Sequence, residues 1–134
     1  QEYVPRLRPL LTKQSTRFLI NTKEIVAPAT DGNFYEYRNY RLKPGATKAW
    51  MDMFLEVMPV REKHSKNVGI WITEGPNPNE VSHMWAYKSL QERSETRAGV
   101  AQEDAWKNFT KAGGALMEEM TSTILMPASF SPLK

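Results

Sequence analysis

The stretch Val81–Leu90, "VSHMWAYKSL", decides the fold because it contains a strand, the end of that strand and the start of a helix. Alternate residues of a strand share a face, so His83 and Trp85 are expected on the same side of a sheet. Ser89 stands three residues before Glu92, the spacing of a capping box at the start of a helix. The stretch therefore predicts a strand followed directly by a helix.

Three further segments have the composition of strands. They are residues 34–42 ("FYEYRNYRL"), 67–74 ("NVGIWITE") and 121–127 ("TSTILMP"), which are rich in aromatic and β-branched side chains. The segment "GPNPN" at 75–79 predicts a turn. It joins the strand 67–74 to a strand over 80–88, so these two strands are expected to form a hairpin.

Apolar residues at helical spacing predict helices over 47–64, 89–99 and 103–120. Pro59 lies inside the first helix and should kink it or end it near Met58. The resulting order, β-α-β-β-α-β, is that of the ferredoxin-like fold, in which an antiparallel four-stranded sheet has its helices on one face. The predicted fold class is therefore α+β.

Alternation along the predicted strands assigns residues to the two faces of this sheet. Those expected to face the helices are Tyr35, Tyr37, Asn39, Val68, Ile70, Ile72, Met84 and Ala86. Those expected on the open face are Glu36, Arg38, Tyr40, Trp71, His83, Trp85 and Tyr87. An aromatic side chain buries about 150–250 Å² when it is covered, so this open face should form an interface or enclose a ligand cavity.

The composition excludes several kinds of site. The 134 residues form one ordinary domain, and they include no cysteine, which excludes disulfides, thiolate metal sites and a cysteine nucleophile. His64 and His83 are too few for a multi-histidine metal site within one chain. No apolar run approaches the roughly 20 residues that a membrane-spanning helix needs. We therefore expect no metal, no cofactor and no transmembrane segment.

The net charge of +3 belongs to a predicted N-terminal arm, residues 1–33. Residues 1–30 contain five basic and two acidic side chains, whereas residues 31–134 contain thirteen of each. A neutral domain attracts nucleic acid weakly, so no nucleic-acid partner is expected. The prolines of the arm predict an extended chain, with a short strand or a turn at 17–20. The basic residues predicted to dock the arm on a partner are Arg6, Arg8, Lys13 and Arg17.

Several segments together resemble the NIPSNAP family, specifically its C-terminal domain. They are "YEYRNYRLKPG" (35–45), "VGIWITE" (68–74), "HMWAYKSLQERSETR" (83–97) and "ILMPASFSPLK" (124–134), with Trp50 and Trp106 between them. The resemblance covers about residues 34–133. We assign 34–128 to the NIPSNAP-like domain and 129–134 to a C-terminal tail.

The resemblance implies a dimeric α/β-barrel fold, in which two such sheets dock face to face. It also implies a mitochondrial protein, in the matrix or at the matrix face of the inner membrane, that acts through protein contacts and has no settled catalytic activity. Family members often carry two such domains, whereas residues 1–33 do not match a first domain. The open face is therefore expected to meet a second NIPSNAP-like domain of another chain or the subunits of a larger mitochondrial assembly.

The first residue, Gln1, agrees with removal of an acid-poor, Arg-containing mitochondrial leader, and an arbitrary starting point explains it equally well. The charge of the arm would also suit a place near a membrane. The sequence thus favours a non-catalytic interaction module that serves as an accessory subunit.

The alternative is a small-molecule-binding or monooxygenase-like enzyme. Some single-domain relatives of this barrel fold are cofactor-independent or haem-degrading monooxygenases, and the haem enzymes place an asparagine, a tryptophan and a histidine around a cavity. Asn39, Trp85 and His83 are the candidates here, but alternation directs Asn39 toward the helices and residues 89–120 contain no histidine. An enzyme requires a cavity beside His83 and Trp85, whereas an interaction module requires that face to be covered by a partner.

Overall fold

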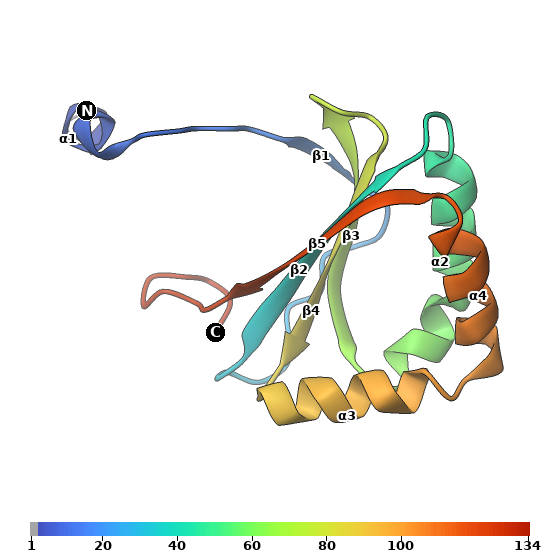
Figure 1. Cartoon of the computed structure of the whole chain (residues 1–134). Helices are drawn as coiled ribbons and strands as arrows, with labels where there is room; N and C mark the ends of the chain where they lie inside the picture. Colours follow the sequence, from blue (N-terminus) through green and yellow to red (C-terminus); the bar gives the residue numbers. More distant parts are fainter. Residues whose placement is uncertain (1–2) are drawn as a thin grey trace.

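The computed structural model of the protein describes residues 3–134, so Gln1 and Glu2 of the predicted arm lie outside the described residues. Figure 1 shows a twisted sheet, helices grouped on one side of it and an N-terminal segment that extends away from it. The elements in chain order are α1 (Tyr3–Leu7), the 3-10 helix η1 (Arg8–Leu10), β1 (Phe18–Asn21), β2 (Phe34–Leu42), α2 (Thr47–Glu62), β3 (Lys66–Gly75), β4 (Glu80–Tyr87), α3 (Leu90–Val100), α4 (Asp104–Gly114) and β5 (Met117–Leu125).

The sheet has the order β1-β3-β4-β2-β5 with every neighbouring pair antiparallel. The strands β2, β3, β4 and β5 and the helices between them reproduce the predicted β-α-β-β-α-β order, which confirms the α+β, ferredoxin-like fold class. The sheet has five strands rather than four because β1, from the arm, pairs with the outer edge of β3. The outer backbone N–H and C=O groups of an edge strand can pair with a further strand. The segment 18–21 forms such a pair with β3.

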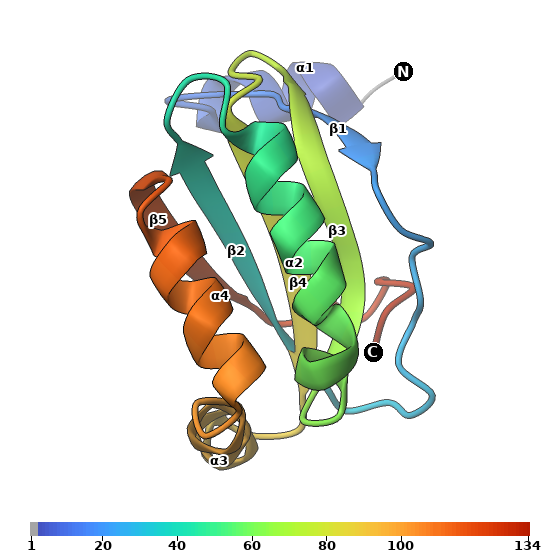
Figure 2. The ribbon, with the colours of Figure 1, turned by 90° about the vertical axis from the view of Figure 1, so that its right-hand side faces the viewer.

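The helices α2 and α4 pack against each other and cover one face of the sheet, with α3 at its end (Figure 2). The start of α3 is as predicted, because Ser89 Oγ accepts a hydrogen bond from the backbone N–H of Glu92 at 3.0 Å. The helix α2 continues past Pro59 to Glu62, so of the two effects predicted for the proline, an end near Met58 is wrong. The core face of α2 continues on both sides of the proline, which outweighs the single hydrogen bond that a proline removes.

The last predicted helix is too long at its C-terminal end. It ends at Gly114, and residues 117–120 belong to β5 instead. Glycine is a weak helix former, and Gly113 and Gly114 stand at this point of the chain. From Met117 onward the backbone pairs with β2, so strand pairing replaces the helical hydrogen bonds.

Most of the predicted open-face residues lie on the opposite face. His83 packs against Phe54 of α2 with ring centroids 4.9 Å apart, and Trp85 belongs to the same core. Strand pairing places Arg38 opposite His83 and Glu36 opposite Trp85, and directly opposed residues share a face. The open-face placement is therefore wrong for Glu36, Arg38, Tyr40, His83, Trp85 and Tyr87, which all face the helices. Trp71 lies on the open face as predicted.

The residues that were expected to face the helices divide between the two faces. In β3, Ile70 and Ile72 face the helices as predicted, but Val68 packs on the open side because the register with β4 shifts between Asn67 and Gly69. The others that lie on the open face, contrary to the prediction, are Tyr35, Tyr37, Asn39, Met84 and Ala86.

The reversal has a physical cause in β2. The prediction assumed that the charged alternate residues of this strand would avoid the helix-covered core. Glu36 and Arg38 are nevertheless buried, at 0% and 7% exposure, because they form an ion pair with each other. Buried charges are tolerated when they are paired and hydrogen-bonded. A charge pair at alternate positions therefore overrides the simple alternation rule.

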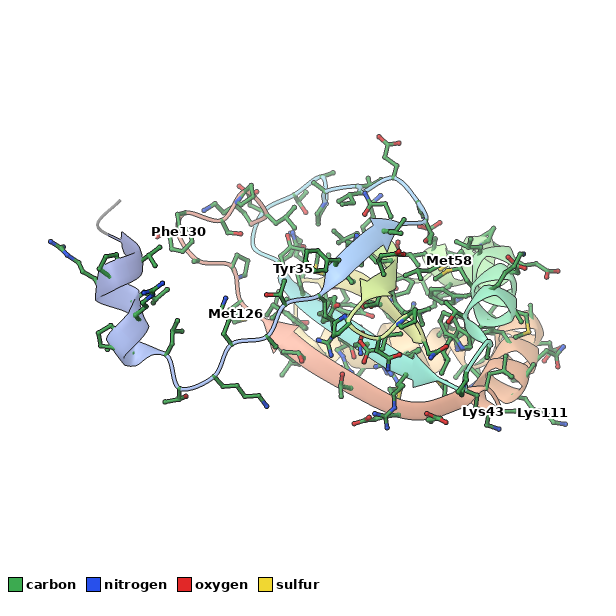
Figure 3. The ribbon with its side chains drawn as sticks, turned by 90° about the horizontal axis from the view of Figure 1, so that it is seen from above. Tyr35, Lys43, Met58, Lys111, Met126 and Phe130 are labelled. Carbon is green, nitrogen blue, oxygen red and sulfur yellow. The ribbon has the colours of Figure 1, made fainter. Side chains whose placement is uncertain are left out.

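Both ends of the chain extend on the side of the sheet that lies away from the helices. Figures 1 and 2 show α1 with its connecting segment, and the C-terminal tail, beyond the sheet on that side. Seen from above, Met126 and Phe130 lie opposite Met58 and Lys111 of the helical layer (Figure 3). The open face is thus bordered by two segments that project past it.

Candidate functional site

A buried carboxylate is at the centre of a charged cluster on the helix-facing side of the sheet. Glu36 accepts hydrogen bonds from Arg38 Nη1 at 2.7 Å, from Arg93 Nη2 at 2.7 Å and Nε at 3.0 Å, and from Ser122 Oγ at 2.6 Å. Burial alone would raise the pKa of Glu36, but the hydrogen bonds from Arg93, Ser122 and Arg38 outweigh it and lower the pKa to about 2. Glu36 is therefore ionised and fully engaged, which suits a structural role better than acid–base chemistry.

His83 is enclosed by aromatic rings beside this cluster. Its ring centroid lies 4.9 Å from that of Phe54 and 5.1 Å from that of Tyr40. The indole N–H of Trp85 donates to His83 Nδ1 at 2.6 Å, so the proton of the neutral imidazole belongs on Nε2. Burial, and then the nearby charges of Arg38 and Arg61, lower the pKa of His83 well below its usual range. His83 is thus a neutral donor.

Arg61 of α2 is a further cation beside His83, and it is not among the residues predicted for the site. Its guanidinium lies 4.3 Å from the ring centroid of Trp85 and 5.5 Å from that of Trp106. It also donates to the hydroxyl of Tyr87 at 3.1 Å and to Ser65 Oγ. Cation–π contacts hold a guanidinium without neutralising its charge. The only feature of the sequence that could have marked Arg61 is its charge, which interrupts the apolar stripe of a predicted helix.

A cavity of about 290 Å³ lies between the sheet and the helices at this place. Its lining includes the charged and aromatic residues just described, together with Trp50, Trp106 and Phe109. The exposed residues Arg97, Ala101 and Thr110 also line it, so the cavity reaches the surface beside α3 and α4. The cavity expected for a small-molecule-binding protein is therefore present beside His83 and Trp85, on the helix side of the sheet.

The haem-enzyme arrangement is not reproduced, because its three candidate residues do not meet. His83 and Trp85 line the cavity, whereas Asn39 lies on the open face, where its Oδ1 accepts a hydrogen bond from Ser82 Oγ at 2.9 Å. The expectation that Asn39 faces the helices is wrong, for the reason that applies to the whole of β2. A metal-binding cluster of three or more histidine, cysteine or acidic side chains is absent from residues 3–134.

The open face contains a smaller aromatic group and is partly covered by the chain itself. The ring of Trp71 lies over Gly69, where an added Cβ would come within 2.5 Å of the indole, and it contacts Tyr37 with ring centroids 6.4 Å apart. Leu133 of the tail packs on the cluster that contains Tyr35. A second hollow, of about 260 Å³, lies between Tyr35, the end of β5 and the tail.

The basic residues of the arm have different surroundings. Arg17 Nε pairs with Glu80 Oε2 of β4 at 2.9 Å, so this arginine contacts its own domain. Arg8 and Lys13 are exposed and make no ion pair within the described part of the chain, and Arg6 is exposed as well. Lys23, further along the arm, pairs with Glu62 at the end of α2. The arm is therefore attached to the domain from residue 17 onward, and docking of its first part on a partner stays a prediction.

The comparison with known families agrees with this architecture. The NIPSNAP family model matches residues 35–132. The chain belongs to the NIPSNAP family. The match covers the four-stranded ferredoxin-like unit, the cavity and most of the tail, and it leaves out β1 and the rest of the arm.

Curated NIPSNAP relatives are longer than this chain. Protein NipSnap homolog 1 of Danio rerio is 33% identical over 107 residues, which are 80% of this chain and 38% of that protein. Protein NipSnap homolog 3A of Homo sapiens is 35% identical over 96 residues, which are 70% of this chain and 39% of that protein. The chain thus spans about two fifths of the length of these relatives.

Solved structures show the same fold. A NIPSNAP family protein of unknown function from Agrobacterium tumefaciens is 34% identical, with a TM-score of 0.73 over 81% of this chain and 100% of that chain. A putative antibiotic biosynthesis monooxygenase from Nitrosomonas europaea is 12% identical, with a TM-score of 0.57 over 78% of this chain and 97% of that chain. The second likeness concerns the fold alone.

Among the described residues, every helix is too short or too polar to cross a bilayer.

Proposed function

We propose that this NIPSNAP-domain protein is a non-catalytic interaction module and serves as an accessory subunit of a larger mitochondrial assembly, in the matrix or at the matrix face of the inner membrane. The observation that carries the proposal is the arrangement of the arm and the tail. Both project beyond the open face of the sheet (Figure 1), and both carry exposed apolar side chains. Contact with a partner would remove the apolar side chains of these segments from water and so stabilise the complex.

The exposed apolar side chains are large and lie on both segments that border the open face. Phe130 of the tail is 90% exposed, Met126 is 75% exposed and Phe18 of β1, at the other edge of the sheet, is 67% exposed. Large exposed apolar side chains of this kind are candidates for an interaction site. Burying apolar area contributes about 25 cal/mol per Å², so covering three such side chains contributes several kcal/mol to association.

Charge supports the same proposal. Arg8 and Lys13 are exposed and belong to the first part of the arm, which extends away from the domain (Figure 1). Residues 3–10 are helical and not extended as predicted. A projecting basic segment with interspersed leucines, such as Leu10 and Leu11, is suited to an acidic groove of another subunit or to a position near anionic lipid headgroups. The partner of the open face is then either a second NIPSNAP-like domain or another subunit of the assembly.

Native size analysis of the protein from isolated mitochondria tests this function. We expect the wild-type chain in a species much larger than a dimer, and the triple variant F18S/M126S/F130S in a small species. The control is Leu90→Ser, which removes an equally exposed apolar residue from α3 and should leave the large species intact. Recovery of the wild type only as a small homodimer, or its absence from mitochondria, would contradict the proposal.

Limited proteolysis tests the arm separately. Tryptic cleavage after Lys13 should be rapid in the isolated protein and slow in the assembled state, because docking covers an exposed backbone. Arg17 is the internal control, since its contact with Glu80 exists within the chain and its protection should change little. Equal cleavage after Lys13 in both states would show that the arm does not dock.

A further inference from the structure

We propose that the cavity between the sheet and the helices binds a small anion with a flat apolar body, of the class of aromatic monocarboxylates. The carboxylate would be held by Arg61 and Arg97 and by the Nε2–H donor of His83. This binding goes beyond the proposed interaction function and does not depend on it, since the cavity lies on the other face of the sheet from the arm and the tail.

The cavity contains buried hydrogen-bond donors without partners among the described residues. His83 Nε2 is buried and has no hydrogen-bond partner among residues 3–134, and the same holds for the indole nitrogen of Trp50. A buried polar group without a partner is unfavourable, so each such group in a folded protein needs an explanation. His83 and Trp50 both line the cavity, and their rings are nearly parallel with centroids 6.5 Å apart. A ligand that carries acceptor oxygens would accept hydrogen bonds from these two donors.

The lining of the cavity carries an excess of positive charge. The cavity lining includes three arginines, Arg38, Arg61 and Arg97, and one acidic residue, Glu36. Glu36 is already engaged by Arg38 and Arg93. Arg61 and Arg97 form no ion pair with a carboxylate in the described part of the chain, and Arg61 is nevertheless buried. A buried guanidinium that lacks a carboxylate favours an anionic ligand, because charge-assisted hydrogen bonds to a carboxylate are the strong ones.

The walls of the cavity are largely aromatic. Rings of Phe54, Trp85, Trp106 and Phe109 line the cavity beside the charged groups. Such walls select a flat apolar body that can stack against them. The volume, about 290 Å³, is at the lower end of the range of small-molecule sites. A one- or two-ring carboxylate combines a single anionic end with such a body.

The probes are 2-naphthoate and its neutral counterpart 2-naphthalenemethanol, added to the whole chain labelled with ¹⁵N. We expect 2-naphthoate to shift the indole N–H signals of Trp50 and Trp85 in a saturable manner. The alcohol should bind at least about tenfold more weakly, because it lacks the charge that the arginines select. Trp71 lies on the open face and serves as the internal reference, so its signal should not move.

Variants then locate the binding. Arg97→Met removes an exposed cation at the entrance and should weaken naphthoate binding about three- to tenfold, and Arg61→Met should weaken it more than tenfold. Arg41→Met is the matched control, because Arg41 is an exposed arginine that pairs with Glu119 on β5 outside the cavity. Ala101→Phe places a ring at the entrance and should abolish binding. If Arg61→Met does not fold, Arg97→Met and Ala101→Phe still decide the question.

Three results would overturn the proposal: equal affinity for the acid and the alcohol, shifts confined to Trp71, and full naphthoate binding by Ala101→Phe. The outcome is separable from that of the interaction function. The isolated chain binds or does not bind the probe whatever its size in mitochondria, and F18S/M126S/F130S leaves the cavity lining unchanged.

Discussion

The two faces of the central sheet contain similar residue types, but they are covered by different kinds of structure. The helix-facing side is covered by α2 and α4 and encloses ion pairs, a neutral histidine and a cavity. The open side is covered only in part, by Leu133 of the tail, and is bordered by exposed apolar side chains. Aromatic rings beside polar groups therefore do not by themselves tell which face of a sheet meets a partner.

The difference concerns how each face satisfies its polar groups. On the helix side, Glu36 is held by charge-assisted hydrogen bonds from two arginines, so removing one member leaves an uncompensated charge in a closed space. On the open side, Asn39, Ser82 and Tyr37 form a chain of neutral hydrogen bonds. Substitutions on the helix side should consequently affect the free energy of unfolding most, and those on the open side should affect association most.

The largest effect is expected for Glu36→Gln. The amide keeps the volume of the side chain but leaves Arg38 and Arg93 without their counter-charge, so the free energy of unfolding should fall by about 3–5 kcal/mol. Urea denaturation followed by tryptophan fluorescence measures it. The control is Glu119→Gln, which breaks an exposed pair with Arg41 and should cost less than about 1 kcal/mol. Similar losses of unfolding free energy for the two variants would show that the buried cluster stabilises the fold no more than an exposed ion pair does.

The next effect is a loss of stability in acid that depends on Glu36. The pKa of Glu36 is about 2 in the folded protein and 4.5 in an ordinary environment, so the folded state binds fewer protons between these values. This stabilisation, of about 3 kcal/mol, is complete above pH 4.5 and is lost as the pH falls toward 2. Denaturation midpoints measured from pH 6 to 2 should fall more steeply for the wild type than for Glu36→Gln. Parallel curves would contradict the assignment.

A smaller effect is expected on the open face for Gly69→Ala. A Cβ at this position would come within 2.5 Å of the indole of Trp71, so the ring must move off the strand. We expect a loss of about 1–3 kcal/mol in the free energy of unfolding and a shift of the Trp71 indole N–H signal in the ¹⁵N spectrum, because the ring enters water. Gly114→Ala is the control, since its added Cβ meets no atom closer than 4.0 Å. An unchanged Trp71 signal in Gly69→Ala would mean that the ring does not lie over this glycine.

The smallest effect on the free energy of unfolding is expected in the tail, where Leu133 and Phe130 should differ. Leu133→Ala removes part of the cover of Tyr35 and should lower the free energy of unfolding by about 1 kcal/mol, whereas Phe130→Ala should leave it unchanged within about 0.5 kcal/mol. Association should respond in the opposite order, because Phe130 is the exposed residue of the pair. Thermal unfolding of the isolated chain and native size analysis of mitochondrial extracts measure the two quantities. A destabilised Phe130→Ala would show that Phe130 packs within its own chain.

Much of the fold could be predicted from local patterns, because each pattern has a local physical cause. The capping spacing of Ser89 and Glu92 located the start of α3, and the turn 75–79 located the hairpin of β3 and β4. A cavity was predicted as one of two uses of the open face, but it lies on the helix side of the sheet. Trp50 and Arg61 lie within the helix predicted over 47–64, and nothing near them in the sequence indicates which strand residues they meet.

The sequence by itself determined the order of the elements, the family and the excess of positive charge in the arm, because periodicity, turn residues and composition act over a few neighbouring positions. Only the tertiary structure decided which face of the sheet the helices cover. In β2 both sets of alternate residues mix rings with polar groups, and the choice between them rests on contacts distant in sequence. Arg93 and Ser122 come from α3 and β5 to engage Glu36, and Phe54 comes from α2 to cover His83. Those contacts bury the charges that alternation alone would place in water.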